Sequence, residues 1–160
     1  MNGGILPLVL LFAAIGLALS FTTARAAWSG AAALAASALV LSFVPVPPNL
    51  TEPVLAGLLI STILTAALTY LPRELPRQWA VAAAINAGLW GGAMASISEM
   101  RGGLAAALPL SLLFIAGQWR PVRNYAIIIK VLASWIIAIA SLAMFVSLVS
   151  TPGYKPDHME

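Results

Sequence analysis

The chain has 160 residues, of which 61% are hydrophobic and only 8% are charged. Because about a quarter of the residues in an ordinary soluble domain are charged, this composition excludes a water-soluble fold. The net charge of +3 comes from basic residues that mostly flank apolar runs, a pattern that sets membrane orientation and does not indicate nucleic-acid binding.

The residue types that carry most chemistry are scarce. Cysteine is absent, which excludes disulfides, thiolate nucleophiles and Cys-ligated metals. The single histidine, His158, and the single aspartate, Asp157, both lie near the C-terminus. Neither an imidazole pair for a haem nor a buried Ser–His dyad can therefore form. We predict no enzymatic activity, no metal and no cofactor.

In chain order, the apolar runs predict an all-α bundle of six transmembrane helices joined by short turns. Crossing ~30 Å of hydrocarbon takes about 20 mostly apolar residues. The expected spans are 5–23, 27–44, 54–71, 79–97, 104–118 and 125–150. No basic region precedes the first, so we interpret it as a retained helix and not as a secretory signal. Residues 1–150 then form one membrane domain, followed by a polar tail at 151–160.

The fifth run is the shortest and contains Pro109. It could cross the bilayer or form a re-entrant segment, which would leave five spanning helices. Proline also ends the second and third runs, at Pro45 and Pro72, because it removes a backbone donor.

Positive charges predict the orientation, because Lys and Arg in short loops stay on the cytoplasmic side. The turns after the first, third and fifth helices hold five arginines: Arg25, Arg73, Arg77, Arg120 and Arg123. The opposite side holds Arg101 and Lys155. We therefore expect both termini outside the cytoplasm. The alanine-rich chain is typical of a bacterial inner-membrane protein.

Polar groups inside the spans are candidates for function, since charge in hydrocarbon costs about 2.5–3.5 kcal/mol. Lys130 is the one charged residue in an expected span interior, and Asn86 lies close to mid-depth in the fourth. Together with Trp90 and Trp135 they could line a substrate path. Alternatively, Lys130 could extend to the interface and Asn86 could bond a neighbouring helix.

Loop charges on the predicted outer face are candidates for the mouth of such a path. They are Glu52, Glu99 and Arg101. The alternative interpretation is that these exposed side chains are solvated and have no further role.

Small residues recur at four-residue spacing, which predicts close helix packing. The positions concerned are Gly16, Ser20, Ala26, Gly30, Ala84, Gly88 and Gly92. This spacing leaves open whether the contacts lie within one chain or between two copies.

Two functions follow from these patterns. The first is transport of a small solute or ion, by a homo-oligomer or by the membrane subunit of a larger transporter. The alternative is a non-catalytic structural or assembly subunit of a membrane complex. In both, the expected partners are the lipid bilayer and further membrane subunits or copies of the chain.

Overall fold

The computed structural model describes residues 5–71, 75–97, 108–109, 111 and 126–148. Within these ranges the chain forms five α-helices and no strand, which confirms the all-α prediction. The helices are α1 (Ile5–Ser20), α2 (Ala24–Ser42), α3 (Thr51–Ala67), α4 (Arg77–Ile97) and α6 (Ala126–Leu148). Of the fifth expected span, 104–118, only positions 108, 109 and 111 lie inside the described residues, so the count of six stays a prediction.

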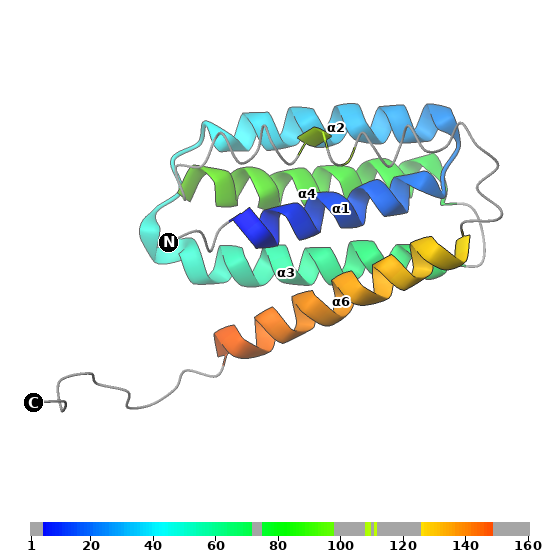
Figure 1. Cartoon of the computed structure of the whole chain (residues 1–160). Coiled ribbons are helices and arrows are strands. Elements are labelled where there is room, and N and C mark those ends of the chain that lie inside the picture. Colours follow the sequence, from blue (N-terminus) through cyan, green and yellow to red (C-terminus); the bar gives the residue numbers. More distant parts are fainter. Residues whose placement is uncertain (1–4, 72–74, 98–107, 110, 112–125, 149–160) are drawn as a thin grey trace, which may run out of the picture.

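Four of these helices are long and apolar enough to cross a membrane, namely α2, α3 with its 3-10 extension to Tyr70, α4 and α6. The shorter α1 lies between α3 and α4 (Figure 1). Beyond the exposed Leu6 in its first turn, its side chains are buried or partly buried, with Leu11, Phe12 and Ile15 at 0% exposure. A helix that is hydrophobic all round belongs in a core, so the 16 residues of α1 form the centre of the bundle.

The helix contacts fix the direction of each element. Gly30 lies near Ala80 and Gly92 lies against Ala38, so α2 and α4 run parallel. Ser61 contacts Asn86 while Gly57 contacts Trp90, so α3 runs antiparallel to α4. Helices α1 and α3 therefore point one way, and α2, α4 and α6 point the other (Figure 1).

This alternation brings Arg25 and Arg77 to one end of the bundle, which we call the basic end. Glu52 lies at the opposite end, in the first turn of α3. The first turn of α1 and the last turn of α6 also lie at that opposite end (Figure 1).

Three helices, α2, α3 and α4, begin two or three residues earlier than the apolar runs indicate. The expected start of α2 was residue 27, but the Thr23 hydroxyl accepts from the Ala26 N–H and the helix begins at Ala24. In α3 the helix begins at Thr51, and Pro53 is tolerated in the first turn, where the N–H groups have no helical partner. Polar residues at these ends are thus helical and not part of the turns.

The closest helix pair is α2 with α4. A Cβ placed at Gly88 would lie 2.7 Å from the Leu34 carbonyl oxygen, and one at Gly92 would lie 2.5 Å from that of Ala38. The two backbones therefore touch along this contact. The Ser96 hydroxyl adds a 2.6 Å hydrogen bond to the Val44 carbonyl at the far end of the pair.

Helix α6 is held differently. Its buried residues Ala133, Ile136 and Ala140 face α1 and α3. From the basic end onward α6 diverges from the bundle (Figure 1). Most of its surface consequently faces away from the other described helices.

Candidate functional site

The polar side chain nearest mid-depth lies on the seam between α3 and α4. The Asn86 Nδ2 atom donates to Ser61 Oγ at 2.6 Å. One helical turn further, the Trp90 ring lies over Gly57. Each step of four residues along α4 is thus matched by four residues back along α3. We call Asn86, Ser61, Trp90 and Gly57 together the α3–α4 seam.

Glycine at position 57 is what makes room for the indole. A Cβ built there would overlap three atoms of the Trp90 ring. Sequence reasoning found Asn86 and Trp90 but missed Ser61 and Gly57. Their spacing was a usable signal. Gly57 and Ser61 are four residues apart, as are Asn86 and Trp90, so the two pairs match when the helices are antiparallel.

The depth of the seam follows from helix geometry. Asn86 is nine residues beyond Arg77, or about 13 Å of helix rise, and α4 is 21 residues long. Its side chain is exposed, whereas Ser61 is only 2% exposed. The amide therefore sits near the middle of the helix and at the surface of the bundle.

Other hydroxyls on α3 turn inward. Together with Ser61, the hydroxyls of Thr62 and Thr65 on α3 and of Thr69 in its 3-10 extension are no more than 2% exposed. Thr62 donates to the Leu58 carbonyl at 2.8 Å and Thr69 to the Ala66 carbonyl at 2.7 Å. Back-bonding of this kind satisfies a hydroxyl within its own helix. The inner face of α3 is therefore hydroxyl-rich and extends from mid-depth to the basic end.

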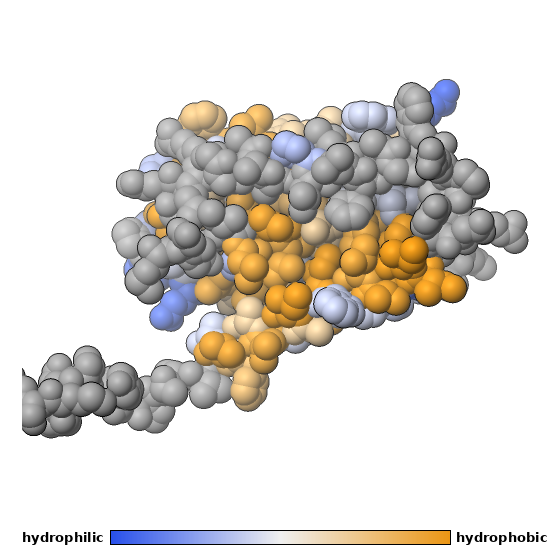
Figure 2. Space-filling view, in the orientation of Figure 1, coloured by the Kyte–Doolittle hydropathy of each residue, from blue (hydrophilic) through white to orange (hydrophobic). Residues whose placement is uncertain are grey.

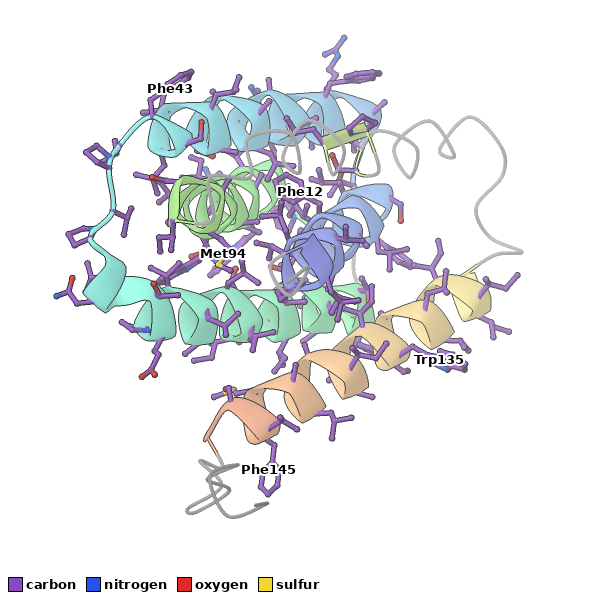
Figure 3. All side chains as sticks on the ribbon, turned by 60° about the vertical axis from the view of Figure 1, so that its left-hand side comes forward. Phe12, Phe43, Met94, Trp135 and Phe145 are labelled. Atoms are coloured by element: carbon purple, nitrogen blue, oxygen red, sulfur yellow. The ribbon has the colours of Figure 1, made fainter. Side chains whose placement is uncertain are left out.

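Two residues expected on the same path lie elsewhere. Trp135 is 67% exposed and points away from the bundle (Figure 3). The Lys130 side chain is exposed, and its backbone carbonyl accepts from the Tyr70 hydroxyl at 2.8 Å. Tyr70 is nine residues from Ser61, roughly 13 Å along α3. The structure thus separates Lys130 and Trp135 on α6 from Asn86 and Trp90 on the seam.

Of the three residues expected at an outer mouth, only Glu52 is described. It is exposed in the first turn of α3, where a carboxylate interacts favourably with the helix dipole. Glu99 and Arg101 lie outside the described residues.

The small residues occupy several contacts. Gly88 and Gly92 meet α2 of the same chain, and Ala84, on the same helix, is buried. Gly30 meets the side chain of Leu19. The remaining members are buried Gly16 and Ala26, and Ser20, whose hydroxyl donates to the Leu17 carbonyl.

Taken together, four long apolar helices around a buried fifth indicate a helical membrane protein. No protein-family model, curated protein or solved structure matches the chain. Among the described residues, no three His, Cys, Asp or Glu side chains cluster as metal ligands.

Proposed function

We propose that the protein is a non-catalytic subunit of the bacterial inner membrane that binds other membrane proteins through the outer face of α6. The observation that carries this proposal is the way α6 is attached. A narrow stripe of Ala133, Ile136 and Ala140 holds it to the bundle, and the Tyr70 hydroxyl fixes its first turns.

The outer face of α6 is large and apolar. Nine large hydrophobic side chains are exposed on the described part of α6, and we define its outer face by six of them: Ile127, Val131, Trp135, Leu142, Phe145 and Val146. Trp135 and Phe145 both project away from the other helices (Figure 3), and the surface around α6 is mostly hydrophobic (Figure 2). Exposed Ser141 lies among these side chains, whereas the Ser134 hydroxyl is hydrogen-bonded to Tyr70 and to the Lys130 carbonyl of its own chain. Small hydroxyl residues are common where transmembrane helices meet, which supports a protein partner on this face.

Substitutions on α6 test this proposal against a closely matched control. Trp135 and Phe145 are 67% and 66% exposed, while Trp28 and Phe43 on and beside α2 are 57% and 68% exposed. We expect a partner to co-purify stoichiometrically with the intact chain from native membranes in a mild detergent. The Trp135→Ala/Phe145→Ala variant should lose that partner, whereas Trp28→Ala/Phe43→Ala should keep it.

Two results would count against the α6 proposal. One is a chain that purifies without any stoichiometric partner. The other is equal loss of the partner in both double variants, because equal loss means that the effect does not depend on α6.

One observation favours a second candidate, transport of a small solute or ion. The buried hydroxyls of α3 and its 3-10 extension place hydrogen-bonding groups along the inside of the bundle, and the outward-facing Asn86 amide is bonded to Ser61 at one end of this row. A chain acting alone as a transporter should give flux in proteoliposomes above that of empty vesicles, and Thr62→Val should reduce it. Flux equal to that of empty vesicles across ions and common small solutes would remove this candidate.

A further inference from the structure

Asn86 belongs to an outward ridge of α4 that the other described residues leave uncovered. Ala82, Ile85, Asn86 and Leu89 are all exposed, and Ile85 and Leu89 are 41% and 43% exposed. Their spacing of three, four and seven residues places them on one face of the helix. We call these four residues the α4 ridge. Its apolar members repeat as in a helix that pairs with another helix.

The amide of Asn86 has more hydrogen-bonding capacity than its own chain uses. A carboxamide offers two N–H donors and an oxygen with two lone pairs. Among the described residues its one hydrogen bond is the donation to Ser61. A second donor and the oxygen remain. Hydrocarbon tails can satisfy neither, and an unsatisfied polar group near the middle of a bilayer is costly.

We infer that a second copy of this chain packs against the α4 ridge, with the two Asn86 amides paired across a two-fold axis along the membrane normal. Such an axis brings each residue to its own counterpart at the same depth, because all copies insert in the same orientation. A carboxamide is self-complementary, since each copy donates one N–H and accepts one in return. This is what an isologous contact requires of a polar group at its centre.

The partner must present a hydrogen-bonding group at the depth of Asn86 and otherwise be apolar. A second copy meets both conditions by symmetry, because Ala82, Ile85 and Leu89 then meet their own counterparts. The hydrogen bond to Ser61 holds the amide in place before the partner arrives. This inference rests on the proposed function only in treating the chain as an associating membrane subunit, and it uses a different face from α6.

The absence of native cysteine makes the dimer directly testable in membranes. Single variants Ala82→Cys, Ile85→Cys and Leu89→Cys are oxidised in native membranes and resolved as monomer or disulfide dimer. A disulfide needs Cα atoms within about 7 Å. We expect all three to cross-link, because the proposed two-fold axis brings each of these positions next to its counterpart in the second copy. Leu39→Cys on α2 is the matched control, since Leu39 is 48% exposed and Leu89 is 43% exposed. It should stay monomeric.

The role of the amide is tested by energy transfer between labelled copies in liposomes. Asn86→Leu keeps the approximate shape but removes the hydrogen bonds, and we expect about tenfold weaker association. Asn86→Gln keeps the amide and should restore most of the association. Ser61→Ala removes only the bond within the chain and should have the smaller effect. Unfolding of each variant in detergent shows that the fold is intact.

The inference is overturned if the ridge cysteines cross-link no more than Leu39→Cys, or if Asn86→Leu associates as tightly as the unmodified chain. Cross-linking at Trp135→Cys in place of the ridge would assign the second copy to α6 and overturn it as well. If the unmodified chain dimerises and the Asn86→Leu variant does not, but the variant still binds a foreign partner through α6, both proposals are supported. If the unmodified chain binds that partner but never dimerises, only this inference is refuted.

Discussion

The contact between α2 and α4 predicts that Gly88 and Gly92 cannot be enlarged even to alanine without moving a helix. In both cases a new Cβ meets backbone, which cannot rotate away as a side chain can; at Gly88 it also overlaps the Ser37 hydroxyl, which lies nearer but can rotate. Ordinary contact begins at 3.4 Å, whereas the new Cβ atoms would lie only 2.7 Å from the Leu34 oxygen and 2.5 Å from the Ala38 oxygen. The helices would therefore have to separate by about 0.7 Å at Gly88 and about 0.9 Å at Gly92.

The expected cost follows from two opposing effects. Overpacking a tight contact costs about 1–3 kcal/mol per site. Replacing glycine by alanine within a helix raises the free energy of unfolding by up to about 1 kcal/mol per site, because alanine has the better helix propensity. For the double variant Gly88→Ala/Gly92→Ala the balance is a net loss of about 2 kcal/mol in the free energy of unfolding.

Reversible unfolding in detergent micelles, followed by circular dichroism, measures this difference. Gly30→Ala is the matched control, because its new Cβ meets the end of the flexible Leu19 side chain and the nearest backbone atom is 3.7 Å away. We expect this control to be neutral or slightly stabilising. The reasoning is refuted if the double variant is as stable as the unmodified chain, or if Gly30→Ala is equally destabilising.

Two further predictions concern α3. Gly57→Ala should lower the free energy of unfolding by about 1–3 kcal/mol, because the Cβ displaces the Trp90 ring. In a Trp90→Ala background that loss should largely disappear. If the effects of the two substitutions add, the contact between Gly57 and Trp90 is contradicted. Tyr70→Phe removes the hydrogen bonds to Lys130 and Ser134 and should raise the amide exchange rate in the first turns of α6 about fivefold, with the rate in α2 unchanged. If the substitution changes the exchange rate equally in both helices, Tyr70 does not hold α6.

Much of the fold could be predicted because long apolar runs have few stable arrangements. The apolar stretches located the four long helices to within a few residues of their observed bounds. The arginines after the first and third helices indicated that these turns share a face, and the alternating helix directions place Arg25 and Arg77 at one end. Errors at helix starts came from capping by Thr23 and from Pro53, which act locally and do not alter hydropathy.

The grouping of functional residues was harder to predict. Asn86 and Lys130 both stood out as polar residues within apolar spans, yet they lie on different faces of the structure. Hydropathy gives the depth of a residue along its helix, but not the direction in which its side chain points within the bundle. For the same reason the four-residue spacing of Ser61 and Gly57 could not by itself identify them as the partners of Asn86 and Trp90, because hydropathy does not say which faces of two helices meet.

The sequence by itself determined that the chain is helical and apolar, because apolar runs of about 20 residues satisfy their backbone groups without water by forming helices. It also determined the depth of each polar group, which depends only on counting along a helix. Only the tertiary structure decided that α1 is the buried centre, that α2 and α4 meet through Gly88 and Gly92, and that Asn86 faces outward. These outcomes depend on the rotation and neighbours of each helix, which are set by side-chain shape at contacts between segments far apart in the chain.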